Sequence, residues 1–213
     1  SVKDNSNKKE SLNIIEELVT LTSNLDKDKN FGKLGGIYLL CEIGKNNLID
    51  SEIREKSLSL LNECTQNNLE GQDLMVKLKF WEFFSFVKDK SQSEKLNNRA
   101  ISVISSNLIG SKIETKKIFF QNKGWKNLIE ICKEDKNSFI ILKSVLMITD
   151  IIQTCSDNSK IIKNIEEGSL FFNEYLKKNS DEITDIIFKI IYFISNINLI
   201  ENKDFKGLGF GVW

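Results

Sequence analysis

Apolar residues recur at helical spacing in several long segments of this chain, separated by short polar turns. From Ser11 to Leu25 the apolar positions are Leu12, Ile14, Ile15, Leu18, Val19 and Leu21. This spacing predicts an amphipathic helix. Comparable patterns follow over residues 53–61, 101–108, 141–152 and 183–194. The sequence therefore predicts an all-α protein with almost no β-sheet.

Glycine recurs with a long period that links these segments. Gly36, Gly124 and Gly168 each follow a short amphipathic segment and precede a new apolar run. The last two are 44 residues apart, the first two are twice that distance apart, and the halfway position is Phe80. A period of this length is typical of armadillo and HEAT arrays, in which each repeat has two or three helices. We therefore expect an armadillo-like α-solenoid of about four three-helix repeats, with Ser11–Leu25 as an N-terminal capping helix.

The turns of this solenoid carry their own signals. Gly35, Gly124 and Gly168 are expected at helix ends, in the left-handed conformation that closes a helix. The Phe80 side chain is too large for a tight turn, so the second repeat is expected to be locally distorted. Ser111 and Glu114 have the spacing of a capping box, which predicts the start of a helix.

Three parts are expected along the chain: a flexible tail over residues 1–10, a repeat domain over residues 11–200 and a C-terminal tail over residues 201–213. The C-terminal tail alternates glycine with apolar residues. A phosphate-binding glycine loop lies between a strand and a helix, and here the chain ends instead. We therefore expect no nucleotide site in this segment.

Composition narrows the functional classes. Thirty basic and thirty acidic residues cancel, which disfavours nucleic acid as the main partner. The chain has no histidine, so the commonest general base and metal ligand are missing; we expect no enzyme activity, no cofactor and no metal. The most apolar stretch, Ile183 to Ile200, contains Asp185 and Lys189, which predicts a buried helix and no membrane span.

Four cysteines stand at positions 41, 64, 132 and 155, and none forms a CxxC motif. Their spacing allows a disulfide within each of two repeats, Cys41–Cys64 and Cys132–Cys155. The alternative, which we favour, is that reduced thiols pack as small core residues.

Several segments resemble the armadillo-type Hsp70 nucleotide-exchange factors. The stretch Asn24–Leu40 is similar to the opening repeat of that family, and Ile53–Asn68 resembles its third-helix motif ending in Cys-x-Gln-Asn-Asn. Phe119–Gly124 and Lys143–Ser144 resemble later family motifs, in the family order. The chain departs from the family at Phe80, where a glycine is expected, and in the run that begins at Asp26.

The resemblance implies a mechanism. Family members wrap the concave face of the array around the ATPase domain of Hsp70 and open its nucleotide cleft, so that ADP leaves. It also favours the cytoplasm, and the lumen of the endoplasmic reticulum is the alternative if a leader has been removed. A monomer is expected.

In an armadillo array the polar positions of the long third helices line the concave face. Between the apolar anchors, these positions predict a partner-binding set: Arg54, Asn62, Gln66, Asn98, Arg99, Ser106, Lys143, Met147 and Asp150. Arg54 and Lys143 coincide with basic positions of the family pattern and rank first. Reversing both charges is expected to weaken partner binding without changing the melting temperature.

The main alternative is an armadillo scaffold without exchange activity. A peptide-binding version of that scaffold usually carries a ladder of asparagines and tryptophans on its third helices. The third-helix ends here hold Asn24, Asn67, Asn107 and Asn196, and no third helix carries a tryptophan. This pattern disfavours the peptide-binding version.

Overall fold

Helices account for all the regular secondary structure in the part of the chain that the structure describes. The computed structural model describes residues 2–22, 30–135 and 137–155. It comprises two compact units, residues 1–148 and 149–213, and α10 (Ser138–Cys155) runs across the division between them. The predicted all-α class is confirmed, whereas the predicted fourth repeat and C-terminal tail lie outside the described residues.

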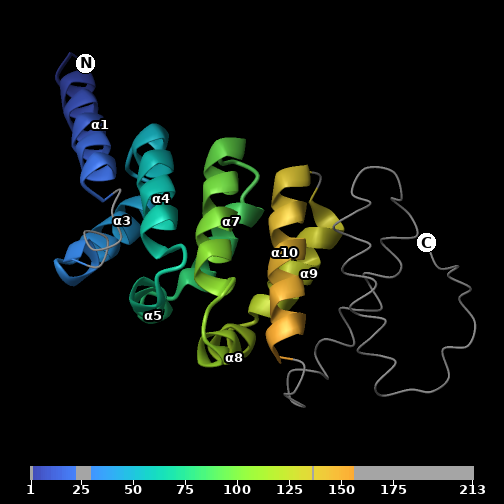
Figure 1. Cartoon of the computed structure of the whole chain (residues 1–213). Helices are drawn as coiled ribbons and strands as arrows, with labels where there is room; N and C mark the ends of the chain where they lie inside the picture. The colour runs from blue at the N-terminus through green and yellow to red at the C-terminus, as the bar shows by residue number, and fades with distance from the viewer. Residues whose placement is uncertain (1, 23–29, 136, 156–213) are drawn as a thin grey trace, which may run out of the picture. The chain divides into compact units, whose positions relative to one another are not determined.

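The first unit is a succession of short and long helices, coloured blue to yellow in Figure 1. Their bounds are α1 (Val2–Thr22), α3 (Gly36–Lys45), α4 (Ser51–Thr65), α5 (Leu69–Lys77), the 3₁₀ helix η1 (Phe80–Phe83), α6 (Phe84–Lys88), α7 (Glu94–Leu108), α8 (Ile113–Gln121) and α9 (Gly124–Glu134). A short helical turn over residues 30–33 precedes α3.

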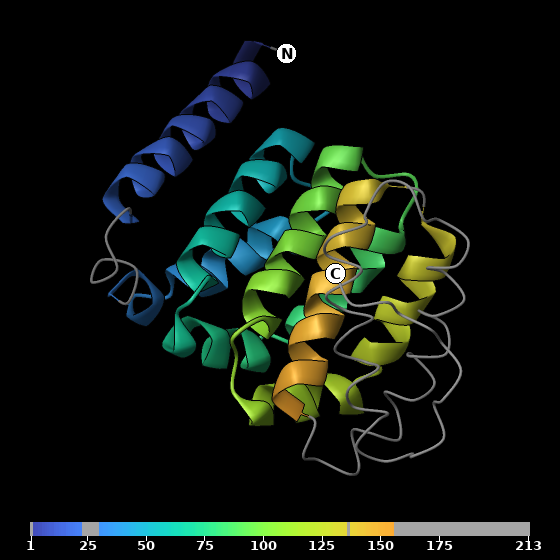
Figure 2. The same ribbon diagram turned by 45° about the vertical axis from the view of Figure 1, so that its right-hand side comes forward.

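These helices form three repeats, each with a short first helix, a second helix and a longer third helix. The third helices are α4, α7 and α10, and they begin 43 and 44 residues apart. In Figures 1 and 2, α1, α4 and α7 lie side by side, and α4 contacts both α1 and α7. The period read from the glycines therefore describes the spacing of the third helices.

The N-terminal segment is a helix from its first described residue. Residues 2–10 form the first turns of α1, where the sequence led us to expect a flexible tail over residues 1–10. Lys8 explains part of the difference, because its ammonium lies 3.1 Å from Asp50 and 2.9 Å from Glu52 at the start of α4. α1 stands where the third helix of a preceding repeat would stand, as predicted for a capping helix.

A continuous apolar core runs between the second and third helices of the first unit. Leu58 and Leu61 of α4 and Ile101 and Ile104 of α7 are fully buried. They recur at an interval of 43 residues, so the same helical face is buried in both repeats. Burying such a side chain contributes about 1.5–3 kcal/mol relative to leaving it in water.

Each second helix is preceded by a residue in the left-handed conformation. These residues are Gly35 (φ 87°), Lys79 (φ 56°) and Lys123 (φ 62°), at intervals of 44 residues. The prediction is confirmed for Gly35 and wrong for Gly124, which is the first residue of α9. Gly168 lies outside the described residues.

Gly124 and Gly36 are required by close packing. A Cβ on Gly124 would lie 2.5 Å from the Phe119 ring, and a Cβ on Gly36 would collide with the Phe31 ring. The second repeat has Phe80 at this position and begins its second helix as the 3₁₀ segment η1, so the predicted local distortion is confirmed.

Helix caps agree with the sequence in part. α4 begins after Asp50, whose carboxylate accepts a hydrogen bond from the Glu52 amide (2.9 Å). The predicted capping box over Ser111–Glu114 is wrong, because α8 begins after Lys112, which makes no side-chain cap bond. The Ser111 hydroxyl instead donates to the Leu108 carbonyl (2.7 Å) and so closes α7.

Candidate functional site

The candidate site is the surface made by the solvent-accessible residues of α4, α7 and residues 138–148 of α10, here called the third-helix surface. On α4 these include Lys56, Ser59, Asn62 and Glu63, and on α7 they include Lys95, Asn98 and Arg99. Over residues 138–148 of α10 they include Phe139, Leu142, Lys143 and Leu146. Three consecutive repeats thus contribute to this surface.

Hydrogen bonds at the starts of the third helices hold this surface together. The Ser93 hydroxyl caps α7 by accepting from the Leu96 amide (3.1 Å), and it donates to Glu55 of α4 (2.7 Å). One repeat later, the Asn137 amide nitrogen donates to Glu94 and Asn98 of α7, at 3.0 Å each. The register of adjacent third helices is therefore set by polar contacts at one end of each helix.

Five of the predicted partner-binding residues in the first unit have solvent access. Gln66 and Arg99 are exposed, and Asn62, Asn98 and Lys143 are half-buried. Asn98 is also bonded to Asn137, as described above. Asp150 is half-buried and belongs to the second unit, residues 149–213, so the structure gives no relation between it and the other five.

The prediction that Arg54 points outward is wrong. Its side chain is 3 % exposed; Nε donates to the Gly44 carbonyl (3.2 Å) and Nη1 donates to Gln92 (3.1 Å). The guanidinium also lies 5.4 Å from the centre of the Phe86 ring. Burial lowers the pKa of Arg54, and the charge of Asp89 opposes that shift. Arg54 therefore joins the first repeat to the second.

Ser106 and Met147 are also buried, so the prediction that their side chains point outward is wrong. The Ser106 hydroxyl lies 3.0 Å from the Thr65 hydroxyl of α4 and donates to the Val103 carbonyl (3.1 Å). The Gln72 amide nitrogen of α5 donates to the Ser106 carbonyl (2.8 Å). The third helices α4 and α7 are covered on more sides than a single apolar stripe suggests: α4 packs against α1, α3 and α7, and α7 packs against α4 and α6.

Asn107 bears on the peptide-binding alternative. It is fully buried, and its amide nitrogen donates to Thr65 Oγ1 (3.1 Å) and to the Val103 carbonyl (2.7 Å). An extended peptide on the surface cannot reach this group. Asn67 is exposed but lies beyond the end of α4 in a left-handed turn (φ 57°). Among the described third helices, these asparagines therefore do not form an accessible ladder.

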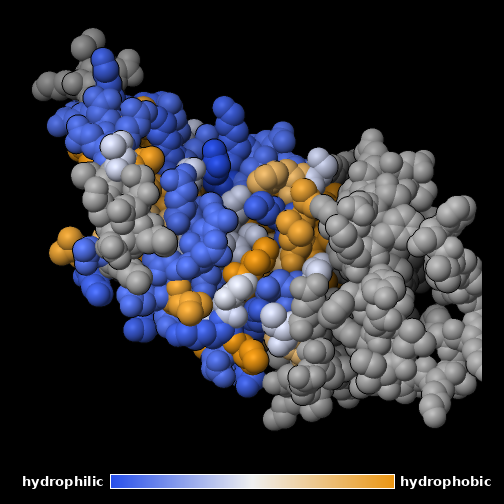
Figure 3. Space-filling model, viewed as in Figure 1, coloured by the Kyte–Doolittle hydropathy of each residue, from blue (hydrophilic) through white to orange (hydrophobic). Residues whose placement is uncertain are grey.

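The third-helix surface changes in polarity from α4 to α10. Figure 3 shows a mostly hydrophilic surface over α1 and α4 and a group of hydrophobic residues near the start of α10. Phe139 is 39 % exposed, and the Lys143 ammonium lies 5.7 Å from the centre of its ring. The apolar pattern treated Leu142 and Leu146 as core, yet both are half-buried at this surface. Only the fold distinguishes them from Ile141 and Val145, which are buried.

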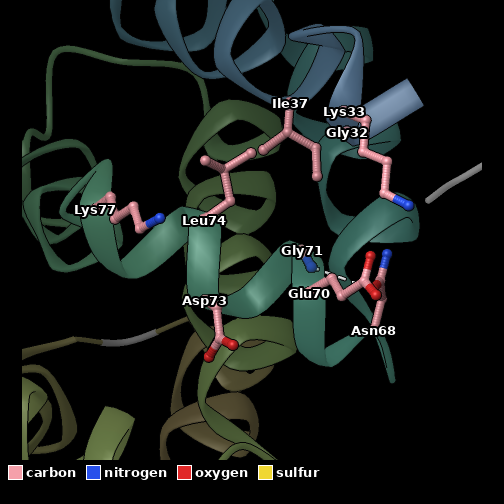
Figure 4. Close-up of a pocket in the computed structure, with 9 residues that line it drawn as sticks. All are labelled: Gly32, Lys33, Ile37, Asn68, Glu70, Gly71, Asp73, Leu74 and Lys77. Carbon is pink, nitrogen blue, oxygen red and sulfur yellow. Dashed lines mark hydrogen bonds between the residues drawn. The ribbon is translucent and has the colours of Figure 1, made fainter. Parts of the chain in front are cut away.

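Apart from the third-helix surface, a polar depression lies between the first helices of the first two repeats. Its volume is about 460 Å³, and the residues drawn in Figure 4 include Lys33, Glu70, Asp73 and Lys77. Asn68 caps α5 at its edge by accepting from the Gly71 amide (3.1 Å), and Asp73 is paired with Lys112 (2.5 Å). Charges of both signs therefore line it, and they do not converge on one point.

The four cysteines are buried free thiols, as the favoured interpretation predicted. Burial raises the pKa of Cys41 to about 11 and that of Cys132 to about 12, so both are protonated at neutral pH. Within the described residues, no cluster of three acidic or cysteine side chains could hold a metal ion. None of the helices in that part of the chain is long and apolar enough to cross a membrane.

Several solved structures with a similar fold are designed proteins. A designed armadillo repeat protein in complex with the peptide (KR)4 is similar with a TM-score of 0.70 and 16% sequence identity, over 87% of this chain and 74% of that one. A computationally designed armadillo repeat protein for modular peptide recognition has a TM-score of 0.69 and 16% identity, over 88% of this chain and 76% of that one. No family model matches the sequence, and neither does any curated protein. The chain therefore has an armadillo-repeat fold.

Proposed function

We propose that this chain is a protein-interaction scaffold that binds a folded partner through the third-helix surface. The observation that carries the proposal is that three adjacent repeats present polar, charged and apolar side chains side by side on α4, α7 and the start of α10. Such a surface offers an apolar anchor at Phe139 and charges at Arg99 and Lys143 that orient a partner. The burial of Asn107 favours a folded partner over an extended peptide.

The partner that we propose is the ATPase domain of an Hsp70 chaperone, and the activity is acceleration of ADP release. The support is the ordered resemblance of Asn24–Leu40, Ile53–Asn68 and Phe119–Gly124 to the armadillo-type exchange factors, together with the armadillo fold. This activity needs no catalytic side chain, because the factor acts by binding the open state of the chaperone more tightly than the closed state. An acceleration of about 100-fold corresponds to about 2.7 kcal/mol of differential stabilisation.

The test follows release of a fluorescent ADP analogue from a cytosolic Hsp70 during a chase with unlabelled ATP. The expected result is a release rate that rises with the concentration of this protein and then saturates. An unchanged rate, with a cytosolic Hsp70 and with one from the endoplasmic reticulum, would overturn the exchange activity. Binding of either chaperone without acceleration would support the alternative, a scaffold without exchange activity.

A double charge reversal locates the surface. Arg99→Glu combined with Lys143→Glu changes two accessible side chains, and we expect about a tenfold or greater loss of chaperone affinity with unchanged helicity. Lys117→Glu is the matched control, because it reverses an exposed charge on the first helix α8. Arg54→Glu is unsuitable, since it would bury a carboxylate beside the Gly44 carbonyl and unfold the protein. A double variant that binds normally would contradict the proposed surface.

A further inference from the structure

An apolar cleft lies between α1 and the first repeat, beside the Lys8–Asp50 ion pair that joins α1 to the start of α4. Its volume is about 460 Å³, and Ile14 and Leu18 of α1 face Leu39 and Ile43 of α3 across it. Ile14 is 51 % exposed and Leu39 is 54 % exposed. Large side chains that remain exposed on two facing helices mark a surface that a partner can cover.

The repeat register shows which element covers the corresponding residues in the later repeats. Ile15 of α1 corresponds to Leu58 and Ile101, because these residues recur at an interval of 43 and all three are buried. In the same register, Ile14 corresponds to Ser57 and Ala100, which have no exposed surface. Those two residues are covered because α3 packs against α4 and α6 packs against α7. Among the described residues, α1 has no second helix of its own.

Leu39 leads independently to the same conclusion. Its counterpart 44 residues later is Phe83, which is fully buried. The end of the preceding second helix covers Phe83: the Lys45 ammonium lies 5.5 Å from the centre of its ring, and Gly44 lies close to its edge. No described helix stands in that position for Leu39. The cleft therefore has the place, the direction and the apolar walls of a binding site for one helix.

The charges around the cleft indicate the kind of helix. Glu10 and Glu17 lie four residues before and three residues after Ile14, and so on the same side of α1. Glu42 lies three residues after Leu39 on α3. All three carboxylates are exposed, and no ion pair holds any of them within the described part of the chain. The nearby cation, Lys8, is engaged by Asp50 and Glu52.

From this geometry we infer that the cleft between α1 and α3 binds a basic amphipathic α-helix of a partner protein. The apolar side chains of that helix, at i, i+3, i+4 and i+7, cover Ile14 and Leu39 in the position that the preceding second helix takes in the next repeat. Its flanking lysines or arginines face Glu10, Glu17 and Glu42. This site is separate from the third-helix surface and does not depend on the proposed exchange activity.

The test uses fluorescence anisotropy with a labelled 16-residue peptide that places leucines at i, i+3, i+4 and i+7 and lysines on the flanks. A peptide of the same composition with scattered leucines controls for non-specific attraction. We expect saturable binding of the patterned peptide to the full chain and at least tenfold weaker binding of the scattered one. No binding of the patterned peptide at 100 μM, or equal binding of the two peptides, would overturn the proposal.

Variants of the full chain locate the site. Leu39→Asp is expected to weaken binding at least tenfold, and Leu69→Asp, at a leucine of similar exposure (48 %) on α5, is expected to leave it unchanged. The triple variant Glu10→Gln, Glu17→Gln and Glu42→Gln alters no apolar contact and should weaken binding about fivefold, with a smaller salt dependence. Binding that none of these changes reduces would overturn the proposal. A dimer of the unaltered chain that Leu39→Asp disperses would also overturn it, in favour of a second copy as the occupant.

Discussion

The first and third repeats differ from the second at the start of the second helix. In the first and third repeats, Gly36 and Gly124 lie beneath the rings of Phe31 and Phe119. In the second repeat the same two positions hold Phe80 and Met75, both fully buried. The second helix therefore supplies the aromatic ring at this place in the second repeat, whereas the first helix supplies it in the other two repeats.

The backbone turn is retained while the side chains are exchanged. The residue before each position is left-handed in all three repeats, whether it is Gly35, Lys79 or Lys123. Phe80 stacks against Phe119 of the next repeat, with ring centres 5.9 Å apart and planes 6° apart, and the chain around it is 3₁₀ rather than α-helical. All three repeats thus share the left-handed turn. Glycine at the following position is required only where an aromatic ring covers it.

Removing the Phe80 ring should change the free energy of unfolding more than the glycine, cysteine and lysine substitutions that follow. Phe80→Ala leaves a cavity beside Phe119, and we expect the free energy of unfolding to fall by about 3–5 kcal/mol. Urea denaturation followed by circular dichroism measures the change. Phe86→Ala is the control, because Phe86 is half-buried and a smaller loss is expected. A loss below about 1 kcal/mol would show that Phe80 does not fill the space that the Phe31 and Phe119 rings fill in the other repeats.

Adding a methyl group to the glycine should have the next largest effect. Gly124→Ala places a Cβ 2.5 Å from the Phe119 ring, so the ring or the helix must move, at a cost of about 1–3 kcal/mol. In a Phe119→Leu background that cost should shrink, and a double-mutant cycle measures the coupling. Gly110→Ala measures the cost of backbone conformation alone, because Gly110 has φ 69° but no atom lies within 4 Å of its Cβ position. The cost at Gly124 comes instead from the collision with the Phe119 ring. Equal costs at Gly124 with and without the Phe119 ring would contradict the proposed packing.

The period and the third helices could be predicted from the sequence because they depend on regular spacing. The distortion at Phe80 could also be predicted, since a large residue interrupts the glycine series. The left-handed Lys79 and Lys123 could not, because lysine carries no local signal for that conformation. They become visible only when the turn before Gly36 is compared with its copies 44 residues later.

The candidate site was harder to predict than the fold. Arg54, Ser106 and Met147 stand between apolar anchors, which suggests exposure, yet all three are buried. A helical wheel describes one buried face, whereas a third helix is covered both by its second helix and by adjacent third helices. The same difference explains why Ile14, with the spacing of a core residue, remains exposed: no described helix covers it as α3 and α6 cover its counterparts on α4 and α7.

The buried thiols of the second helices in the first and third repeats should make the stability of the protein depend on pH. Cys41 is in α3 and Cys132 is in α9, whereas α6 of the second repeat has no cysteine. The fold raises both thiol pKa values, to about 11 and about 12, so the folded state keeps protons that the unfolded chain loses above pH 9. Stability should therefore fall as the pH rises from 9 to 10, by about 1 kcal/mol for each thiol. Cys41→Ala and Cys132→Ala should each flatten this slope; a slope that neither changes would contradict it.

The smallest expected change in stability tests whether the left-handed turn before the second helix is the same in all repeats. A left-handed lysine costs about 1 kcal/mol relative to glycine, and the greater freedom of an unfolded glycine offsets part of that gain. Lys79→Gly and Lys123→Gly should therefore each change the free energy of unfolding by about 0 to +1 kcal/mol. Lys117→Gly, inside α8, should instead destabilise the protein by about 0.5–1 kcal/mol. If Lys79→Gly is as damaging as Lys117→Gly while Lys123→Gly is neutral, the turn before Phe80 differs from the other two, and the second repeat departs from the pattern in its backbone as well as in its side chains.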